Sequence, residues 1–275
     1  MNKEIKTVDE KKGIIRITTS DERFYAIPSP DKITGLPSEY DFIPSVTWIC
    51  SYFPKGVSFW KWLASKGWDE AEHIKQEAGE KGSKVHRAIE RLIKGETIPM
   101  DLKLTDTNNE NEEELSVEEY ECLMAFTDWF NKVNPEIIAV EIITVNKEEK
   151  YAGTVDIVCR IDDQLYIIDI KTGQYIWPSY ELQLSAYKHA INPEEYKIKD
   201  YENVKLAVLQ VGYNRNKNRY KFTEINDKFD LFLATKQIWK NECENISPMQ
   251  KDYPIELKLN IKKEEKNIIN KKKGK

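Results

Sequence analysis

Three consecutive runs rich in isoleucine and valine constrain the fold of this chain more than any other feature. They are IIAVEIITV (137–145), GTVDIVCRI (153–161) and QLYIIDIKT (164–172), and short polar turns separate them. Runs of β-branched residues bounded by polar turns are typical of strands. Because the connections are short, consecutive strands must pair antiparallel. We therefore predict three consecutive antiparallel strands.

Helical and strand patterns alternate around these three runs. Apolar residues at helical spacing predict helices at Phe59–Leu63 and Ile74–Leu92, and Ser116 with Glu119 marks the N-cap of a helix over 116–133. The segments that follow are a helix (180–191), two strands (204–214 and 219–225) and a closing helix (228–243). With the β-rich N-terminal segments 14–20, 23–29 and 41–54, this order predicts an α/β fold in which helices cover a mixed sheet.

The chain has a length that one domain can accommodate, and we predict a single domain over 1–260. Within it, 44–100 forms a helical part bearing tryptophans and a histidine, and 135–246 forms the core. The acidic segment 101–115 is predicted to be a mobile loop, and the lysine-rich segment 261–275 a flexible basic tail. Because the acidic and basic residues are concentrated locally, the net charge of −5 neither supports nor excludes a nucleic-acid partner.

The four cysteines are far apart and show no C-x-x-C spacing, so neither disulfides nor a closed zinc site are expected. The first thirteen residues, MNKEIKTVDEKKG, contain no apolar signal core, and no apolar run is long enough to span a bilayer. We therefore expect a cytoplasmic protein, in a bacterial or phage-infected host cell.

Charged residues meet at one end of the second and third predicted strands. If Asp162-Asp163 is a two-residue turn, the register places Asp156 opposite Asp169, and Lys171 shares a face with Asp169. Burying two carboxylates this close together is unfavourable unless a cation compensates them. The alternative is an exposed strand end, against which the flanking Ile and Val residues argue.

Such a site suits hydrolysis of a phosphodiester. Oxygen ligands favour Mg²⁺ or Mn²⁺, which polarises a phosphate oxygen and lowers the pKa of bound water, and a neighbouring lysine stabilises developing charge. The chain has no G-x-x-x-x-G-K-[ST] stretch, so ATP hydrolysis on a P-loop is not indicated.

Four motifs in combination resemble the RecB-type branch of the PD-(D/E)XK nuclease superfamily. They are Gly153-Thr-Val-Asp156, Asp169-Ile-Lys171-Thr, Gln183-Leu-Ser-Ala-Tyr187 and the upstream Lys81-Gly-Ser-Lys-Val-His86. Within that branch the chain most resembles mitochondrial genome maintenance exonuclease-like and phage exonucleases, which share its Pro44-Ser-Val-Thr47 stretch. Val155 departs from the proline that gives the superfamily its name, a departure that RecB-type members often show.

The resemblance implies a restriction-endonuclease-like core and a role for each matching residue. His86, Asp156, Asp169 and the backbone carbonyl of Ile170 would be metal ligands, and Lys171 would be the catalytic lysine. Gln183 and Tyr187 lie at positions i and i+4, so one helix face can present both to the site. We expect them to orient a phosphate or the lysine, with plain helix surface as the alternative.

Three further features leave alternatives open. Pairing about a centre between Glu148 and Glu149 sets Glu141 opposite Asp156, so Glu141 is either a metal contact through water or part of an exposed strand face. The basic segment NRNKNRYK (214–221) either holds DNA phosphates or is a solvated hairpin tip. The tryptophans at 48, 60, 62 and 68 could stack on unpaired bases, but we expect most of them to lie in the core.

Together these expectations define a hypothesis: a Mg²⁺- or Mn²⁺-dependent DNA exonuclease that prefers a free single-stranded end and has a protein partner in replication or recombination. One alternative is a structure-selective or sequence-specific endonuclease on the same core. Another is a catalytically silent DNA-binding module, which would leave no reason to keep an electrostatically costly cluster of Asp156, Asp169 and Lys171.

Overall fold

A five-stranded mixed sheet forms the centre of the computed structural model, which describes residues 4–10, 12–19, 22–28, 40–105 and 112–243. Its strand order is β11-β10-β9-β8-β7. The strands are β7 (Glu136–Asn146), β8 (Tyr151–Ile161), β9 (Gln164–Lys171), β10 (Lys205–Val211) and β11 (Tyr220–Ile225). β7, β8 and β9 are antiparallel as predicted, β10 runs parallel to β9, and β11 is antiparallel to β10.

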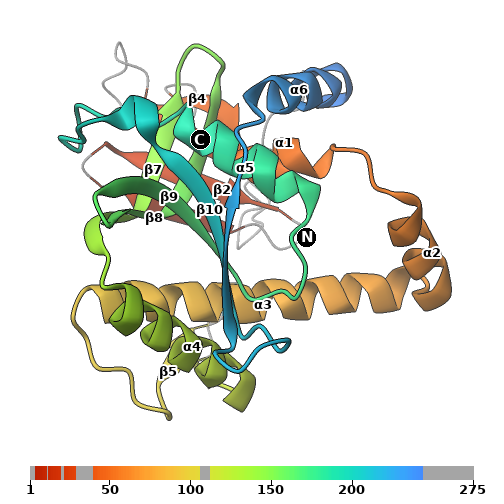
Figure 1. The fold of residues 1–275 in the computed structure, drawn as a ribbon. Helices are drawn as coiled ribbons and strands as arrows, with labels where there is room; N and C mark the ends of the chain where they lie inside the picture. The colour runs from red at the N-terminus through yellow and green to blue at the C-terminus, as the bar shows by residue number, and fades with distance from the viewer. Residues whose placement is uncertain (1–3, 11, 20–21, 29–39, 106–111, 244–275) are drawn as a thin grey trace, which may run out of the picture.

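Helices cover both faces of this sheet (Figure 1). On one face lie α3 (Trp68–Ile93) and α4 (Val117–Val133), and their apolar side chains join one buried cluster with alternate residues of the strands. On the other face lie α1 (Val46–Ser51), α5 (Pro178–Lys188) and α6 (Phe229–Cys243), which form a second cluster. The near-continuous Ile and Val runs follow from this two-sided burial. The predicted α/β fold with a mixed sheet is confirmed.

A second, four-stranded antiparallel sheet precedes the core. It consists of β1 (Glu4–Asp9), β2 (Ile14–Thr18), β3 (Arg23–Pro28) and β4 (Tyr40–Pro44), paired in chain order. At its end, Ser45 caps α1 by accepting a hydrogen bond from the backbone N–H of Trp48, and it forms a bridge with Ala152 of β8. This sheet therefore continues directly into the core at the strand that carries Asp156.

Two local predictions from the sequence are confirmed in detail. Asp162 and Asp163 both have positive φ, 47° and 66°, as a two-residue hairpin turn of the primed type requires, and the pair register runs from Ile161–Gln164 outward. Ser116 and Glu119 form the capping box of α4, in which each side chain accepts from the other residue's backbone N–H.

The acidic segment predicted as a mobile loop has ordered ends. β5 (Lys103–Thr105) pairs with β6 (Glu112–Glu114), whereas residues 106–111, like the lysine-rich segment 261–275, lie outside the described residues. A short 3₁₀ turn, η2 (Tyr201–Asn203), precedes β10.

The expectation that most of the four tryptophans lie in the core is wrong. Trp48 is buried, but Trp60 and Trp68 are 56% and 69% exposed and Trp62 is also exposed. The reason is that α2 (Val57–Lys66) buries no residue, and with the beginning of α3 it extends away from the sheets (Figure 1).

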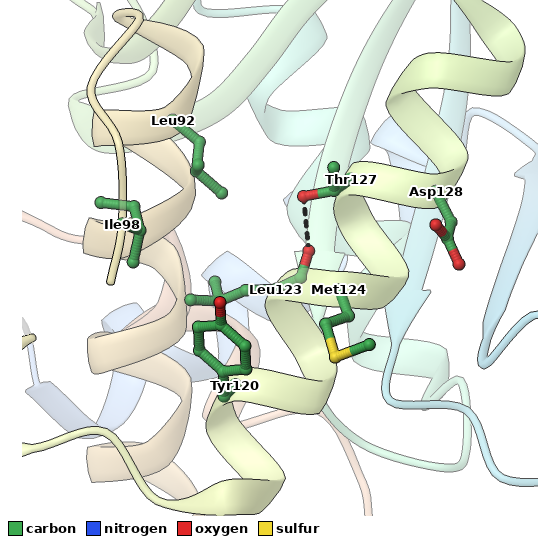
Figure 2. A pocket seen from close by; sticks show the side chains of 7 residues that line it. All are labelled: Leu92, Ile98, Tyr120, Leu123, Met124, Thr127 and Asp128. Atoms are coloured by element: carbon green, nitrogen blue, oxygen red, sulfur yellow. Dashed lines mark hydrogen bonds between the residues drawn. The ribbon is translucent and has the colours of Figure 1, made fainter. Parts of the chain in front are cut away.

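A cavity of about 220 Å³ opens between α3 and α4 (Figure 2). None of the predicted site residues lines it; its walls are Leu92, Ile98, Tyr120, Leu123, Met124, Thr127 and Asp128. Among the described helices, none combines the length and the apolar character needed to cross a membrane.

Candidate active site

The candidate site begins where β8 and β9 separate. Their backbone pairing ends at Ile157–Ile168, one position before the predicted pair of Asp156 with Asp169. There the Asp156 side chain replaces the missing backbone acceptor, because its Oδ2 receives the N–H of Ile170 at 2.7 Å. The carboxylate of Asp156 therefore lies at the point where the backbone pairing of the two strands ends.

His86, Glu141 and Asp156 form a compact group at this point, each offering one ligand atom within 4.8 Å of the others. His86 Nδ1 lies 3.4 Å from Asp156 Oδ1 and 3.8 Å from Glu141 Oε1. On its other side, His86 Nε2 lies 2.9 Å from the carbonyl oxygen of Ile170. Glu141 is half-buried in this group, so it does not belong to an exposed strand face, which was the alternative to a metal contact.

Asp169 lies beside this group and is held by α5, the helix that carries Gln183. Its Oδ2 is 2.7 Å from Lys171 Nζ, and its Oδ1 accepts a hydrogen bond from Gln183 Nε2 at 3.1 Å. Gln183 also donates to the hydroxyl of Tyr187 at 2.8 Å. Both α5 residues are buried, so the helix-surface alternative for them is wrong. They fix the carboxylate of Asp169 rather than Lys171.

Burial and charge act in opposite directions on the group around His86. Burial alone would lower the pKa of His86, but the carboxylates of Asp156 and Glu141 raise it well above its ordinary value. Burial would raise the pKa of Asp156, yet His86, Lys171 and the Ile170 N–H hold that pKa below its ordinary value. The protonated imidazole thus compensates Asp156 in the metal-free protein.

The remaining acids are less well compensated. Burial, together with the charge of Asp156, raises the pKa of Asp169 to about 6 despite the nearby Lys171 ammonium. Burial also raises the pKa of Glu141, and Asp156 adds to the effect. Burial would lower the pKa of Lys171, but Asp169 and Asp156 raise it. The site therefore holds excess negative potential, which a divalent cation would relieve.

Glycines and one distorted strand position allow these elements to approach. Gly153 packs directly against the ring of Tyr187: a Cβ there would lie 2.4 Å from Tyr187 Cε1. Gly82, one turn before His86 on α3, faces Thr172 just beyond the end of β9. Glu141 has a φ of 50°, the left-handed region that non-glycine residues rarely occupy inside a strand. Such outliers gather at functional sites.

The donor set fits a hard divalent cation. One imidazole and two carboxylates are present within ligand distance of one another, with Asp169 adjacent, and oxygen-rich sets of this kind suit Mg²⁺ and Mn²⁺. The strand register left a metal contact through water as one reading of Glu141, and in the structure Glu141 offers a ligand atom within the group itself. The Ile170 carbonyl, expected as a ligand, lies 2.9 Å from His86 Nε2.

Tyr180 and Gln210 contribute to the site although the sequence did not single them out. Lys171 Nζ lies 4.7 Å from the centroid of the Tyr180 ring, a cation–π contact that holds the ammonium beside Asp169. Gln210 is buried next to Lys171 in the parallel pair and donates to the Gly173 carbonyl. Tyr180 lies three residues before Gln183 on α5, a helical spacing that could have indicated it.

Comparison with known proteins assigns the class. A family model described as the PD-(D/E)XK nuclease superfamily matches residues 60–257, which include every residue of the site described above. The chain belongs to the PD-(D/E)XK nuclease superfamily, and it is a nuclease, a phosphodiester hydrolase whose substrate is DNA. Among curated proteins, none matches the chain.

Two solved structures are similar to parts of the chain at low identity. The alkaline exonuclease LHK-Exo from Laribacter hongkongensis is 10% identical, with a TM-score of 0.37, and the match covers 73% of this chain and 87% of that one. The structure of SSO0001 is 18% identical, with a TM-score of 0.28, over 46% of this chain and 58% of that one.

Proposed function

We propose that this protein is a Mg²⁺- or Mn²⁺-dependent DNA exonuclease that acts on a free single-stranded end. The observation that carries the metal dependence is the group of His86, Glu141 and Asp156, whose ligand atoms lie within 4.8 Å, beside the Asp169–Lys171 pair at 2.7 Å. In this proposal the three residues of the group hold the cation, and Asp169 completes its shell. A bound cation polarises a phosphate oxygen and lowers the pKa of a water molecule.

Neighbouring side chains hold the Lys171 ammonium and the Asp169 carboxylate in place. Lys171 is fixed by Asp169 on one side and by the Tyr180 ring on the other, so its ammonium needs little reorganisation to stabilise charge developing on the phosphate. Gln183 holds Asp169, and Tyr187 holds Gln183, which sets the direction of the carboxylate. This supporting layer is typical of metal sites, where outer partners orient the ligands.

Exposed aromatic residues support a single-stranded substrate. Trp60, Trp62 and Trp68 are exposed on α2 and at the beginning of α3, the helix that carries His86 eighteen residues further along. Unpaired bases stack on such side chains, whereas a duplex hides its bases. From Trp68 to His86, α3 spans about 27 Å at the usual rise per residue, a length compatible with a strand lying along the helix.

The test is digestion of labelled DNA by the purified full chain. Single-stranded oligonucleotides labelled at the 5′ or the 3′ end should be shortened progressively with Mg²⁺ or Mn²⁺, blunt double-stranded oligonucleotides should be shortened more slowly, and closed single-stranded circles should remain intact. Lys171→Met should abolish cleavage. Lys188→Met is the matched control, because Lys188 forms a similar pair with Asp227 at 3.0 Å outside the site.

Each outcome separates one alternative from the proposal. Rapid nicking of closed circles would replace the exonuclease by an endonuclease on the same core. Tight binding of DNA without cleavage under any divalent cation would favour a silent DNA-binding module. Undiminished cleavage in excess EDTA would refute metal dependence.

A further inference from the structure

Two exposed aromatic rings lie on the segment that follows β9, the strand that carries Asp169 and Lys171. Tyr175 and Trp177 are 60% and 49% exposed, with ring centroids 6.3 Å apart. Tyr175 lies four residues after Lys171, so its backbone is within about 14 Å of the lysine at the maximum reach of the chain. Large aromatic side chains exposed this close to a site are a candidate ligand surface.

This segment is held rigidly although its rings are in solvent. Gln210 donates to the Gly173 carbonyl at 2.8 Å, and Gln174 donates to the Gly212 carbonyl at 2.9 Å. Gln174 also accepts from the backbone N–H of Asn214 at 2.9 Å. These bonds tie the segment after β9 to the segment after β10, so the rings have a fixed backbone and lose little entropy on binding.

Positive charge accompanies the rings. The guanidinium carbon of Arg215 lies 4.8 Å from the centroid of the Tyr175 ring, and Lys217 follows two residues later. Within the described part of the chain, neither Arg215 nor Lys217 forms an ion pair, whereas Arg219 pairs with Glu121. Aromatic rings interleaved with free cations are complementary to a nucleic-acid strand, whose bases stack and whose phosphates carry charge.

We propose that Tyr175, Trp177 and Arg215 form a stacking platform that binds bases of a single DNA strand within about four stacked nucleotides of the bond that is cut. The proposal deepens the proposed function and names the segment of the substrate that this surface receives. In it the rings take the bases, Arg215 bridges the Tyr175 ring and a phosphate, and the strand is led towards Lys171. This assigns the basic segment 214–221 to substrate binding rather than to a plain hairpin tip.

Binding of the full chain to a fluorescein-labelled thymidine oligonucleotide in EDTA, measured by anisotropy, tests the platform without cleavage. Tyr175→Ala and Trp177→Ala should each weaken binding by about 5- to 150-fold, the range expected when one stacked base is lost. Tyr175→Phe should bind like the wild type, since the ring and not its hydroxyl stacks. Ile238→Ala, at an exposed apolar residue of α6, is the matched control and should change nothing.

An oligonucleotide with an abasic tract removes the stacking bases from the ligand, as the Ala variants remove the rings from the protein. The wild type should bind it more weakly, and Trp177→Ala should then cause little further loss, because the stacking has already been removed. Equal losses on normal and abasic strands, or unchanged binding by the Ala variants at wild-type melting temperatures, would overturn the platform.

A small substrate separates failure of the platform from failure of the proposed function. Bis(4-nitrophenyl) phosphate carries a cleavable phosphodiester but no bases, so the platform variants should hydrolyse it at the wild-type rate with Mn²⁺. If the wild type cleaves DNA while the variants bind and cleave it equally well, only the platform is wrong. If the wild type cleaves neither substrate, the proposed function fails, and the ring-dependent binding in EDTA still decides the platform.

Discussion

Gly153→Ala should destabilise the protein, because it places a methyl group against the buried ring of Tyr187. The added Cβ would lie 2.4 Å from Tyr187 Cε1 and 3.3 Å from Val46 Cγ2, where carbon atoms normally keep about 3.5–4.0 Å. The Tyr187 ring would have to move by about 1 Å, yet it is buried and its hydroxyl accepts from Gln183. Overpacking of this kind costs about 1–3 kcal/mol, although alanine's smaller loss of backbone entropy offsets up to ~1 kcal/mol.

Thermal unfolding of metal-free protein measures the effect. After this offset Gly153→Ala should melt up to about 12 °C below the wild type at this chain length, and its DNA cleavage should fall because Gln183 no longer holds Asp169 in place. Gly79→Ala is the control, since a Cβ there meets nothing within 4 Å and α3 should gain ~0.5–1 kcal/mol.

A second substitution tests whether the ring of Tyr187 causes the loss of stability in Gly153→Ala. Tyr187→Leu removes the ring that the new Cβ meets, so in the double variant the Gly153→Ala penalty should shrink by about 0.5–3 kcal/mol. A single variant as stable as the wild type, or strictly additive losses in the double variant, would show that Gly153 is not required by its contact with Tyr187.

Four further predictions concern the site. Mg²⁺ or Mn²⁺ at a hundredfold excess over Kd should stabilise the protein by about 2.7 kcal/mol, seen as a melting temperature about 5–11 °C higher than in EDTA. His86→Ala should weaken metal binding by more than ~10- to 100-fold, the loss typical when a residue that only orients a ligand is removed. Mn²⁺ should restore the activity of this variant better than Mg²⁺, and a loss independent of metal identity would make His86 a core residue. Because the pKa of His86 is raised in the metal-free protein and a ligand must be unprotonated, metal binding should release a proton from His86 and tighten as pH rises. Calorimetry in two buffers measures the release, which His86→Gln should reduce while the release from Asp169, whose pKa is about 6, remains. Lys171→Met should lower kcat at least about a hundredfold with an unchanged circular dichroism spectrum; full activity in this variant would remove Lys171 from the mechanism.

Local features of this fold could be predicted from the sequence because short-range physics determines them. The Asp162-Asp163 turn fixes the β8–β9 register, and the residues of the α4 capping box are three apart in the chain. Alternation along the strands then placed Asp169 and Lys171 on one face, and the two lie 2.7 Å apart in the structure. Each of these inferences needed only neighbours in sequence or in one hairpin.

Contacts between distant elements could not be predicted in the same way. The spacing of residues does not reveal that α3 sets His86 against the Ile170 carbonyl; only the resemblance indicated His86. Nor did the register show that the strands separate at Asp156, because a side chain that replaces a backbone acceptor leaves no periodic signal. The exposed tryptophans were misjudged because helical spacing of aromatics does not tell whether a helix packs on the core.

The division of the ligand group among elements has a consequence for biosynthesis. His86 emerges from the ribosome on α3 well before the carboxylates on β7, β8 and β9, and β9 lies inside the sheet between β8 and β10. Strand β9 gains its second neighbour only after β10 has been synthesised and has paired alongside it. A ribosome-bound chain stalled before β10 therefore carries every proposed metal ligand while β9 is still an edge strand, so we expect hydrolytic competence to arrive late, when β10 pairs alongside β9.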